Sequence, residues 1–444
     1  MGIKNSPRQK AFEILFRIHS ANAYSNLTLD TYLQKENMDL RDKAFVSALV
    51  YGVCERQITL DYNLSCYLKQ PIKKLKPEVL IALRMGAFQL LFMDKIPPSA
   101  AVNESVNLVK NNKSAFASGL VNAVLRNIMK NGLHLPAEND KEYLKVKYSC
   151  PEWLVNLWSE SYGRENAEKI LEHSLGEVPV YFRVNTTKTT SDELINILTN
   201  EGVEAEKCLC TQDALVLRKQ GSIENLDAFK KGLFHVQDLS SQLCASLLDA
   251  KEGDSVLDVC SAPGGKTFTI CERMNDKGSL TACDIYPARV NLIKEGAERL
   301  GLSSVSAVVS DASVFNEAFQ KFDKVLCDVP CSGLGIIRRK PEIKYKSPDD
   351  IDKLYNLQYL ILNVTARYVK NGGRLVYSTC SLNPSENTAI CNKFLNENKD
   401  FHPIEIPDGD KFGIVDNNML TVMPHFNDSD GFFIAVFERK EEQQ

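Results

Sequence analysis

The 444-residue sequence lacks long hydrophobic runs, because no stretch of about 18 consecutive apolar residues occurs in it. Its first residues, Met-Gly-Ile-Lys-Asn-Ser-Pro, are polar and lack the apolar core of a secretory signal. We therefore expect a cytoplasmic protein without a membrane span. The apolar content of 44% and the charged content of 25% are ordinary for a globular protein. A chain of this length predicts about three domains.

The sequence also lacks recognisable metal and disulfide motifs. It has 13 cysteines, an odd number, none of them spaced C-x-x-C, and its six histidines are scattered singly. Neither a zinc site nor a disulfide framework is indicated by these spacings. We therefore expect no metal, and we expect most cysteines to be reduced and buried as small apolar residues.

Two common nucleotide-binding loops are absent from the most distinctive stretch, Asp258-Val-Cys-Ser-Ala-Pro-Gly-Gly-Lys-Thr267. A phosphate loop needs a glycine where Cys260 stands, and a dinucleotide fingerprint needs spaced glycines, whereas Gly264 and Gly265 are adjacent. The stretch nevertheless follows a short apolar run and opens a predicted helix. Strand, glycine turn and helix in this order let a backbone approach a nucleotide-like ligand closely. The pattern favours a ligand without a triphosphate, with a plain tight turn as the alternative.

Charge of one sign is also lacking, since the formal net charge is only −4. Its distribution is uneven: residues 1–140 carry 18 Lys and Arg against 12 Asp and Glu, and the remaining 304 carry 35 against 45. A basic head on an acidic body is compatible with an RNA-facing domain, and a solvated surface explains it equally well.

Three domains are predicted along the chain. Residues 1–140 read as an all-helical bundle without clustered catalytic groups, a docking or RNA-binding domain. Residues 141–237 mix helices with short strands and form a small α+β domain, in which the helices are Glu152–Trp158 and Glu165–Leu171 and the strands are Val180–Val184 and Ala214–Arg218. From residue 238 onward strands alternate with helices, which predicts an α/β domain with a mostly parallel, doubly wound sheet.

The expected elements of the last domain can be given by residue range. One helix begins at Pro287 and ends at Gly301, and another begins at Pro348 and ends near Gly372. Two late apolar runs are expected to form a hairpin that closes the sheet edge. The predicted strands are Ser255–Cys260, Ser279–Ile285, Ser306–Ser310, Lys324–Val329 and Arg374–Ser378, and the hairpin runs are Leu420–Val422 and Gly431–Phe437.

Three acidic residues are predicted at successive strand ends. Asp284 ends the second strand, 20 residues after Gly264, where a carboxylate can accept hydrogen bonds from ribose hydroxyls. Asp311 ends the third strand and Asp328 lies in the fourth. A single acid at such a place is usually a helix cap or a turn residue, but three in succession favour a ligand-lined edge.

Two cysteines leave neighbouring strands at the same edge. Cys331 lies in Asp328-Val-Pro-Cys-Ser-Gly333, and Cys380 lies in Ser378-Thr-Cys-Ser381. A thiolate that adds to carbon 6 of a pyrimidine turns carbon 5 into an enamine-like centre able to attack a methyl sulfonium, and a base must later remove the carbon-5 proton. A free thiol is only a few per cent ionised at neutral pH, so a nearby positive charge such as Lys266 would promote the reaction.

These three stretches together resemble the S-adenosylmethionine-dependent RNA cytosine-5 methyltransferases of the NOL1/NOP2/Sun family. The helical head resembles the antitermination factor NusB in Asn103-Glu-Ser-Val-Asn-Leu-Val-Lys110 and Val121-Asn-Ala-Val-Leu-Arg-Asn127. The resemblance covers nearly the whole chain and implies a Rossmann-like class I methyltransferase domain behind a NusB-like bundle. The NusB-like head favours family members that modify 16S (small-subunit) ribosomal RNA over those that modify transfer RNA.

The resemblance also implies roles for the residues that match its motifs. The glycine loop would hold the methionine end of S-adenosylmethionine; its residues are Cys260, Ser261, Ala262, Pro263, Gly264, Gly265 and Lys266. Ser261 departs from the alanine that the family often has, and we expect no loss of binding. Asp284 would bind the ribose, Asp311 would lie near the adenine, and Asp328 would lie near the methyl group and the base.

The same resemblance distinguishes the two cysteines. Family members use the T-C cysteine as nucleophile, so Cys380 is expected to attack the base and Cys331 to help expel the product. Enzymes that act on cytosine in DNA use the P-C cysteine instead.

RNA recognition is predicted for a basic loop that follows Gly333. Its candidate RNA-binding residues are Arg338, Arg339, Lys340 and Lys344, with Tyr345 placed near an unstacked base. A solvated charge run is the alternative interpretation. The partner is then ribosomal RNA, without DNA or membrane, and a monomer is expected. Two other functions stay open: a transfer RNA methyltransferase, and an RNA-binding scaffold with an inactive methyltransferase domain.

Overall fold

The computed structural model describes residues 6–21, 38–208, 211, 213–217 and 223–441. The chain forms two compact units. The N-terminal unit comprises Met1–Gly176 together with the distant segment Ile337–Tyr345. The C-terminal unit comprises Glu177–Ile336 and Lys346–Gln444. One short segment from the second half of the sequence is therefore part of the N-terminal unit.

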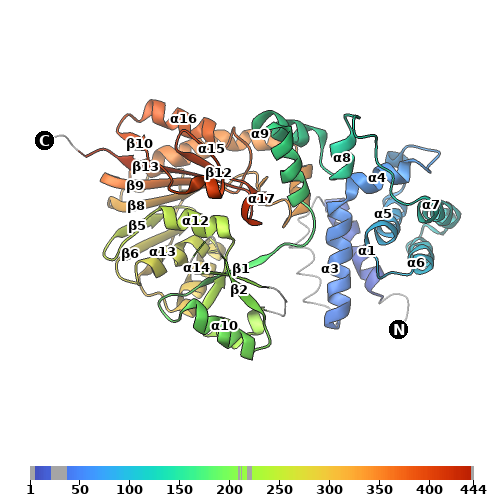
Figure 1. The fold of residues 1–444 in the computed structure, drawn as a ribbon, viewed down its shortest axis with the longest axis horizontal. Helices are drawn as coiled ribbons and strands as arrows, with labels where there is room; N and C mark the ends of the chain where they lie inside the picture. Colours follow the sequence, from blue (N-terminus) through green and yellow to red (C-terminus); the bar gives the residue numbers. More distant parts are fainter. Residues whose placement is uncertain (1–5, 22–37, 209–210, 212, 218–222, 442–444) are drawn as a thin grey trace. The chain divides into compact units, whose positions relative to one another are not determined.

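The described part of the N-terminal unit is helical, as predicted (Figure 1). Its central helix is α5, in which every residue from Val79 to Gln89 is buried. A helix that is hydrophobic all round belongs in the middle of a bundle, and α1, α3, α4, α6 and α7 contact it. The helices are α1 (Pro7–Ala21), α3 (Leu40–Glu55), α4 (Gln57–Ser65), α5 (Pro77–Phe92), α6 (Pro98–Asn111), α7 (Ser118–Asn131), α8 (Tyr143–Lys147) and α9 (Glu152–His173).

Helix α9 joins two segments that the sequence pattern predicts as separate helices. Gly163 interrupts it with a φ of 79°, a left-handed conformation that glycine adopts without steric cost. The chain therefore changes direction at Gly163, and the two predicted helices lie on either side of it.

A small antiparallel sheet begins the C-terminal unit, with the strand order β2-β3-β1-β4. The two predicted strands are confirmed as β1 (Val180–Val184) and β3 (Ala214–Leu217), while Arg218, the predicted last residue of β3, lies outside the described residues. The other elements are β2 (Ala205–Lys207), β4 (Phe234–Val236), α10 (Ser191–Asn200) and α11 (Asp227–Lys230).

The large sheet of the C-terminal unit has the strand order β11-β12-β13-β9-β8-β5-β6-β7, with β10 paired to β13. The five strands from β9 to β7 are parallel to one another, which confirms the predicted doubly wound sheet. The strands are β5 (Ser255–Asp258), β6 (Ser279–Asp284), β7 (Val305–Val309), β8 (Phe322–Asp328), β9 (Val369–Thr379), β10 (Phe401–Pro403), β11 (Gly413–Asp416), β12 (Met419–Val422) and β13 (Phe432–Arg439).

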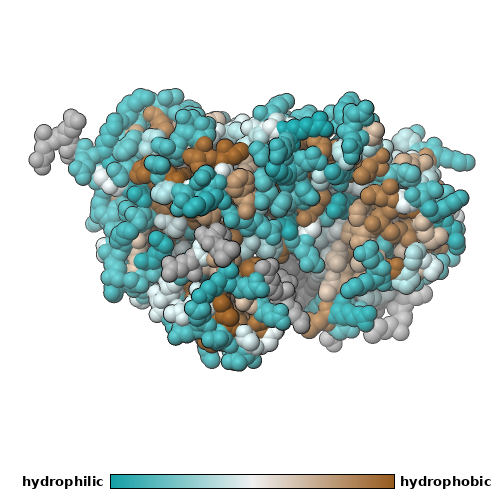
Figure 2. Space-filling view, viewed as in Figure 1, coloured by the Kyte–Doolittle hydropathy of each residue, from teal (hydrophilic) through white to brown (hydrophobic). Residues whose placement is uncertain are grey.

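Helices cover both faces of this sheet (Figure 1). One hydrophobic cluster includes side chains of α12, α13 and α14, and another includes side chains of α15 and α16. The visible surface of the molecule is mostly hydrophilic, with hydrophobic residues in separate groups (Figure 2). The helices are α12 (Leu239–Leu247), α13 (Gly265–Arg273), α14 (Pro287–Leu300), α15 (Pro348–Ala366), α16 (Thr388–Glu397) and α17 (Pro424–Asn427).

Two expectations about this sheet need correction. The hairpin of β12 and β13 is antiparallel as predicted, but β11 pairs with β12 and forms the edge instead. The helix that begins at Pro348 ends at Ala366 rather than near Gly372, because Gly372 lies within β9. A register shift between Phe322 and Lys324 accommodates the extra residues of β9, a β-bulge that periodicity does not predict.

Candidate active site

The residues predicted to take part in the reaction lie at the ends of four adjacent strands of the large sheet. The strands β6, β5, β8 and β9 are neighbours and run parallel, so their carboxyl ends meet at one edge. Asp284 is the last residue of β6, Asp328 is the last residue of β8, and Cys380 directly follows β9. The strand order also reverses between β8 and β5, the place where ligands bind in doubly wound sheets.

The glycine loop connects β5 to α13. Gly264 adopts a φ of 111°, and a Cβ on it would lie 2.3 Å from the ring of Phe268. Ser261 is buried, and its hydroxyl donates to the carbonyl of Cys283 at 2.8 Å. The serine hydroxyl is therefore paired with the neighbouring strand β6. Glycine is required at position 264 because the left-handed backbone and the Phe268 ring leave no room for a side chain.

Asp258 lies beneath this loop and is fully buried. Its Oδ2 accepts a hydrogen bond from Thr267 at 2.7 Å, while its Oδ1 has no partner. Burial raises the pKa of this carboxyl to about 7, and the hydrogen bond from Thr267 only partly opposes the effect. The Asp258 carboxylate therefore supports the start of α13 from beneath the loop.

The acids predicted to bind the nucleoside have different surroundings. Asp284 is buried; its Oδ1 accepts from the backbone N–H of Tyr286 at 3.0 Å, and its Oδ2 lies 3.1 Å from Arg289. Arg289 also donates to the carbonyl of Ala262, and so connects the acid to the glycine loop. Asp311 is exposed two residues beyond β7 and binds the backbone and hydroxyl of Ser313.

The two cysteines predicted to act on the base lie together. The Sγ atoms of Cys331 and Cys380 are 3.2 Å apart, and both side chains are partly exposed. The hydrogen bond to Cys380, together with burial, raises the pKa of Cys331 well above its ordinary value, and the charges of Glu386 and Asp328 add to the effect. The arrangement favours the thiol form of Cys331, within hydrogen-bond distance of Cys380.

Lys266 and Asp328 form an ion pair between the glycine loop and the end of β8. The Lys266 ammonium lies 2.7 Å from Asp328 Oδ2 and 4.9 Å from the centre of the Phe432 ring. Burial by itself lowers the pKa of Lys266, but the Asp328 carboxylate outweighs it and raises that pKa. The hydroxyl of Ser378 donates to the other oxygen of Asp328 at 2.7 Å. Lys266 therefore pairs with Asp328, an interaction that the sequence did not predict.

The sequence pattern did not single out Glu386, a fully buried residue that binds Ser332 and Ser381. Its local sequence, Asn-Pro-Ser-Glu-Asn, reads as a polar surface turn. The only signal available beforehand is that a serine follows each of the two cysteines.

The basic segment predicted to bind RNA belongs to the N-terminal unit. Arg338, Arg339 and Lys340 are partly exposed there. Lys344 is fully buried, and its ammonium donates to the carbonyl of Glu55, the last residue of α3, at 2.6 Å. The hydroxyl of Tyr345 donates to the carbonyl of Cys54 in the same place. In this structure Lys344 and Tyr345 anchor the segment to α3 rather than presenting their polar groups to a ligand.

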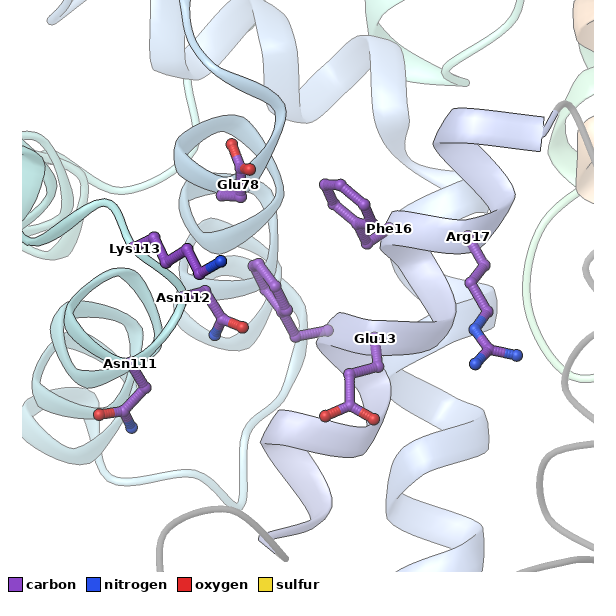
Figure 3. A pocket seen from close by; sticks show the side chains of 8 residues that line it. Glu13, Phe16, Arg17, Glu78, Asn111, Asn112 and Lys113 are labelled. Atoms are coloured by element: carbon purple, nitrogen blue, oxygen red, sulfur yellow. The ribbon is translucent and has the colours of Figure 1, made fainter.

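A cavity of about 340 Å³ lies in the N-terminal unit (Figure 3). It combines two phenylalanine rings with charged groups of both signs, and it holds neither a cysteine nor a histidine. It offers none of the nucleophiles that the predicted reaction needs. The lining residues are Phe12, Glu13, Phe16, Arg17, Glu78, Asn111, Asn112 and Lys113.

Two further observations concern the described residues as a whole. Among them, no group of three His, Cys, Asp or Glu side chains is suited to a metal ion. No helix in the part of the chain that the structure describes is both long enough and apolar enough to cross a membrane.

The fold is that of a class of protein, the Rossmann-like methyltransferases that use S-adenosylmethionine. Three family models match the chain: 16S rRNA methyltransferase RsmB/F at residues 245–438, the NusB family at 5–130, and the ferredoxin-like domain of RsmF/B-like methyltransferases at 150–224.

Relatives and solved structures agree with these models. The chain is 39% identical over 447 residues to the "Probable ribosomal RNA small subunit methyltransferase B" of Bacillus subtilis, covering 98% of this chain and 99% of that protein. It is 34% identical to ribosomal RNA small subunit methyltransferase B of Pseudomonas syringae, covering 88% and 86%. The crystal structure of PH0851 matches with a TM-score of 0.81 at 26% identity, covering 97% and 98%.

This protein belongs to the ribosomal RNA small subunit methyltransferase B (RsmB) family. The predicted resemblance to NOL1/NOP2/Sun enzymes with a NusB-like head is thereby confirmed, as is the predicted fold class. The chain is a ribosomal RNA methyltransferase that uses S-adenosylmethionine.

Proposed function

We propose that this protein methylates carbon 5 of a cytosine in 16S ribosomal RNA through a covalent bond between Cys380 and carbon 6 of the base. One observation carries the proposal: the Cys380 and Cys331 sulfur atoms lie 3.2 Å apart where β8 and β9 end. Carbon 5 of cytosine is a poor nucleophile, and a thiolate bonded to carbon 6 makes it reactive. A single cysteine would suffice for that addition, whereas a second one beside it suits the release of the product.

The cofactor would lie along the glycine loop. S-adenosylmethionine, when bound, supplies a methyl group on a positively charged sulfur. The loop from Cys260 to Lys266 would hold its methionine end, Asp284 its ribose, and Asp311 would lie near its adenine. The place of this loop, at the carboxyl end of β5 where the strand order reverses, supports a ligand here.

The residues of the chain would then act in order on the base. The Cys380 thiolate bonds to carbon 6, and the electron pair of the 5,6 double bond becomes available at carbon 5 to accept the methyl group. A base then takes the carbon-5 proton, and the electron pair of that C–H bond re-forms the 5,6 double bond. The bond between Cys380 and carbon 6 breaks, and its electron pair leaves on the Cys380 sulfur. We assign Cys331 to this release step. Asp328, held by Lys266 and Ser378, would lie beside the base and the methyl group.

Replacement of each cysteine tests the assignment. We expect Cys380→Ala to abolish transfer of a labelled methyl group to 16S ribosomal RNA, because no bond to carbon 6 can form. Cys331→Ala is expected to accumulate a denaturant-resistant adduct between protein and RNA, because addition proceeds and release does not. Cys66→Ala, at an exposed position of the N-terminal unit, is the control and should leave transfer unchanged. A fully active Cys380→Ala enzyme would overturn the proposal.

The identity of the RNA is tested separately. Bisulfite sequencing of RNA from a deletion strain is expected to lose a 5-methylcytosine from 16S ribosomal RNA, and loss from transfer RNA instead would favour the alternative substrate. A protein that binds no S-adenosylmethionine in calorimetry would favour the alternative of an RNA-binding scaffold.

The remaining predictions about the whole protein belong to this proposal. We propose three domains, 1–140, 141–237 and 238–444, and the family models at 5–130, 150–224 and 245–438 support that division. Arg338, Arg339 and Lys340 are proposed to contact RNA phosphates. We also propose that the protein acts as a monomer in the cytoplasm, on RNA and not on DNA, without a metal ion.

A further inference from the structure

Glu386 is a buried carboxylate for which the proposed reaction has no direct use. It is fully buried, in the turn between β9 and α16. Its Oε1 accepts from the backbone N–H of Ser332 at 2.7 Å and from the Gln358 amide at 2.9 Å. Its Oε2 accepts from the hydroxyls of Ser332 at 2.5 Å and Ser381 at 2.6 Å. Four donors thus offset the cost of burying this charge.

The donors belong to the two loops that carry the reactive sulfurs. Ser332 directly follows Cys331, and Ser381 directly follows Cys380. Consecutive Cα atoms are about 3.8 Å apart, so fixing each serine also restricts the cysteine before it. The two serine hydroxyls lie 2.9 Å from each other. One carboxylate therefore joins two loops whose sulfur atoms lie 3.2 Å apart.

Gln358 connects this network to a rigid helix. It extends from α15, and its amide donates to Glu386 and also to the carbonyl of Pro330 at 3.0 Å. Pro330 and Ser332 are the two neighbours of Cys331 in the chain. The network thus holds the backbone on both sides of Cys331, but it reaches Cys380 through Ser381 alone. A carboxylate that served only to fill the core would not need donors from these particular residues.

We propose that Glu386 is a positioning residue of the methyl transfer, which holds Cys331 and Cys380 in the mutual geometry that addition and release require. It acts through Ser332 and Ser381 and does not touch the base. The inference rests on the two-cysteine reaction proposed above. Its geometric part, that Glu386 sets the distance between the two sulfurs, can be measured without RNA and without the methyl donor.

The first experiment measures how fast Cys331 and Cys380 form a disulfide with diamide. The two thiols together lose two electrons and two protons, and the N=N bond of diamide gains them and becomes a hydrazine. We expect Glu386→Ala to slow the appearance of the linked tryptic peptide about tenfold, because a displacement near 1 Å already costs a reaction one to two orders of magnitude. Glu386→Gln keeps an acceptor for Ser332 N–H and a donor for both hydroxyls, and should recover most of the rate.

The second measurement separates positioning from binding. Glu386→Ala is expected to lower kcat about 100-fold while the KM for S-adenosylmethionine stays within about twofold, because the glycine loop is untouched. The exposed Glu405→Ala is the matched control and should change neither quantity. If Glu386→Ala does not fold, the double variant Ser332→Ala/Ser381→Ala decides the question, because it removes both hydroxyl donors and leaves both cysteines.

The outcomes distinguish this inference from the proposed function. An unchanged disulfide rate in folded Glu386→Ala, or in the double serine variant, overturns the positioning role even if Cys380→Ala is inactive. A slowed disulfide rate together with an active Cys380→Ala enzyme keeps the geometric part, and overturns both the proposed reaction and the role of Glu386 in it. A slowed rate with reduced kcat and an inactive Cys380→Ala enzyme supports both.

Discussion

The packing of Lys344 against α3 can be tested quantitatively, because the charged ammonium group of this side chain is buried. Its side chain is fully inaccessible, and burial lowers its pKa from 10.5 to about 8. Nearby Cys150 and Glu55 only partly oppose that effect. Each pKa unit corresponds to about 1.4 kcal/mol, so keeping Lys344 charged at neutral pH costs the folded state about 3 kcal/mol. The hydrogen bond to the Glu55 carbonyl offsets about 1 kcal/mol of this destabilisation.

The direction of the pH dependence follows from proton binding. Between pH 8 and 10.5 the unfolded chain still holds the Lys344 proton while the folded chain has released it. Stability rises with pH wherever the unfolded state binds more protons. The buried charge of Lys344 therefore destabilises the folded state by its full amount below about pH 8, and this destabilisation disappears as the pH approaches 10.5.

Lys344→Met should accordingly stabilise the N-terminal unit by about 2 kcal/mol at pH 7, because it removes the buried charge and loses one hydrogen bond. The advantage should shrink above pH 8 and change sign near pH 10.5, where only the lost hydrogen bond remains. Urea unfolding followed by tryptophan fluorescence measures this, since both tryptophans, Trp153 and Trp158, lie on α9 in the same unit.

The comparison between variants isolates Lys344 from the other groups that titrate in this range. Lys130→Met, at an exposed position of α7, serves as the control and should change stability by less than about 0.5 kcal/mol at every pH. A Lys344→Met protein that is less stable at pH 7, by an amount independent of pH, would refute the reasoning and show that the ammonium is not buried at a cost.

Two further predictions concern the proposed cofactor site, and both are measured by calorimetry with S-adenosylmethionine. Gly264→Ala should weaken binding at least about tenfold, because its Cβ would overlap the Phe268 ring at a φ of 111°; Gly119→Ala, with no atom within 4 Å, should bind normally. Asp284→Asn should weaken binding about tenfold to 100-fold through loss of charge-assisted hydrogen bonds to the ribose. An unchanged Kd would contradict either assignment.

Much of the fold was predictable because its signals are local. Proline at a helix start and glycine at its end set the limits of α14 at Pro287 and Leu300, with Gly301 in the left-handed conformation. Strand ends rich in acids and cysteines were predicted to meet, because parallel strands present their carboxyl ends at one edge. The ends of long elements were less predictable, since the bulge in β9 depends on its pairing with β8.

The predictions that failed involve contacts between residues far apart in the chain. The sequence around Lys344 and Tyr345 predicts a basic surface loop, because amino-acid composition shows which side chains are charged but not which are buried. Its burial depends on the backbone carbonyls of Cys54 and Glu55, almost 300 residues earlier. No local pattern contains that information.

By itself, the sequence determined the order of the elements, the glycine loop, and the edge of the sheet at which acids and cysteines gather, because periodicity and turn chemistry are properties of neighbouring residues. Only the tertiary structure decided that Cys331 and Cys380 lie in contact, that Lys266 binds Asp328, and that Glu386 joins the loops behind both cysteines. These distances depend on how separate strands and loops pack, and packing is set by the whole fold.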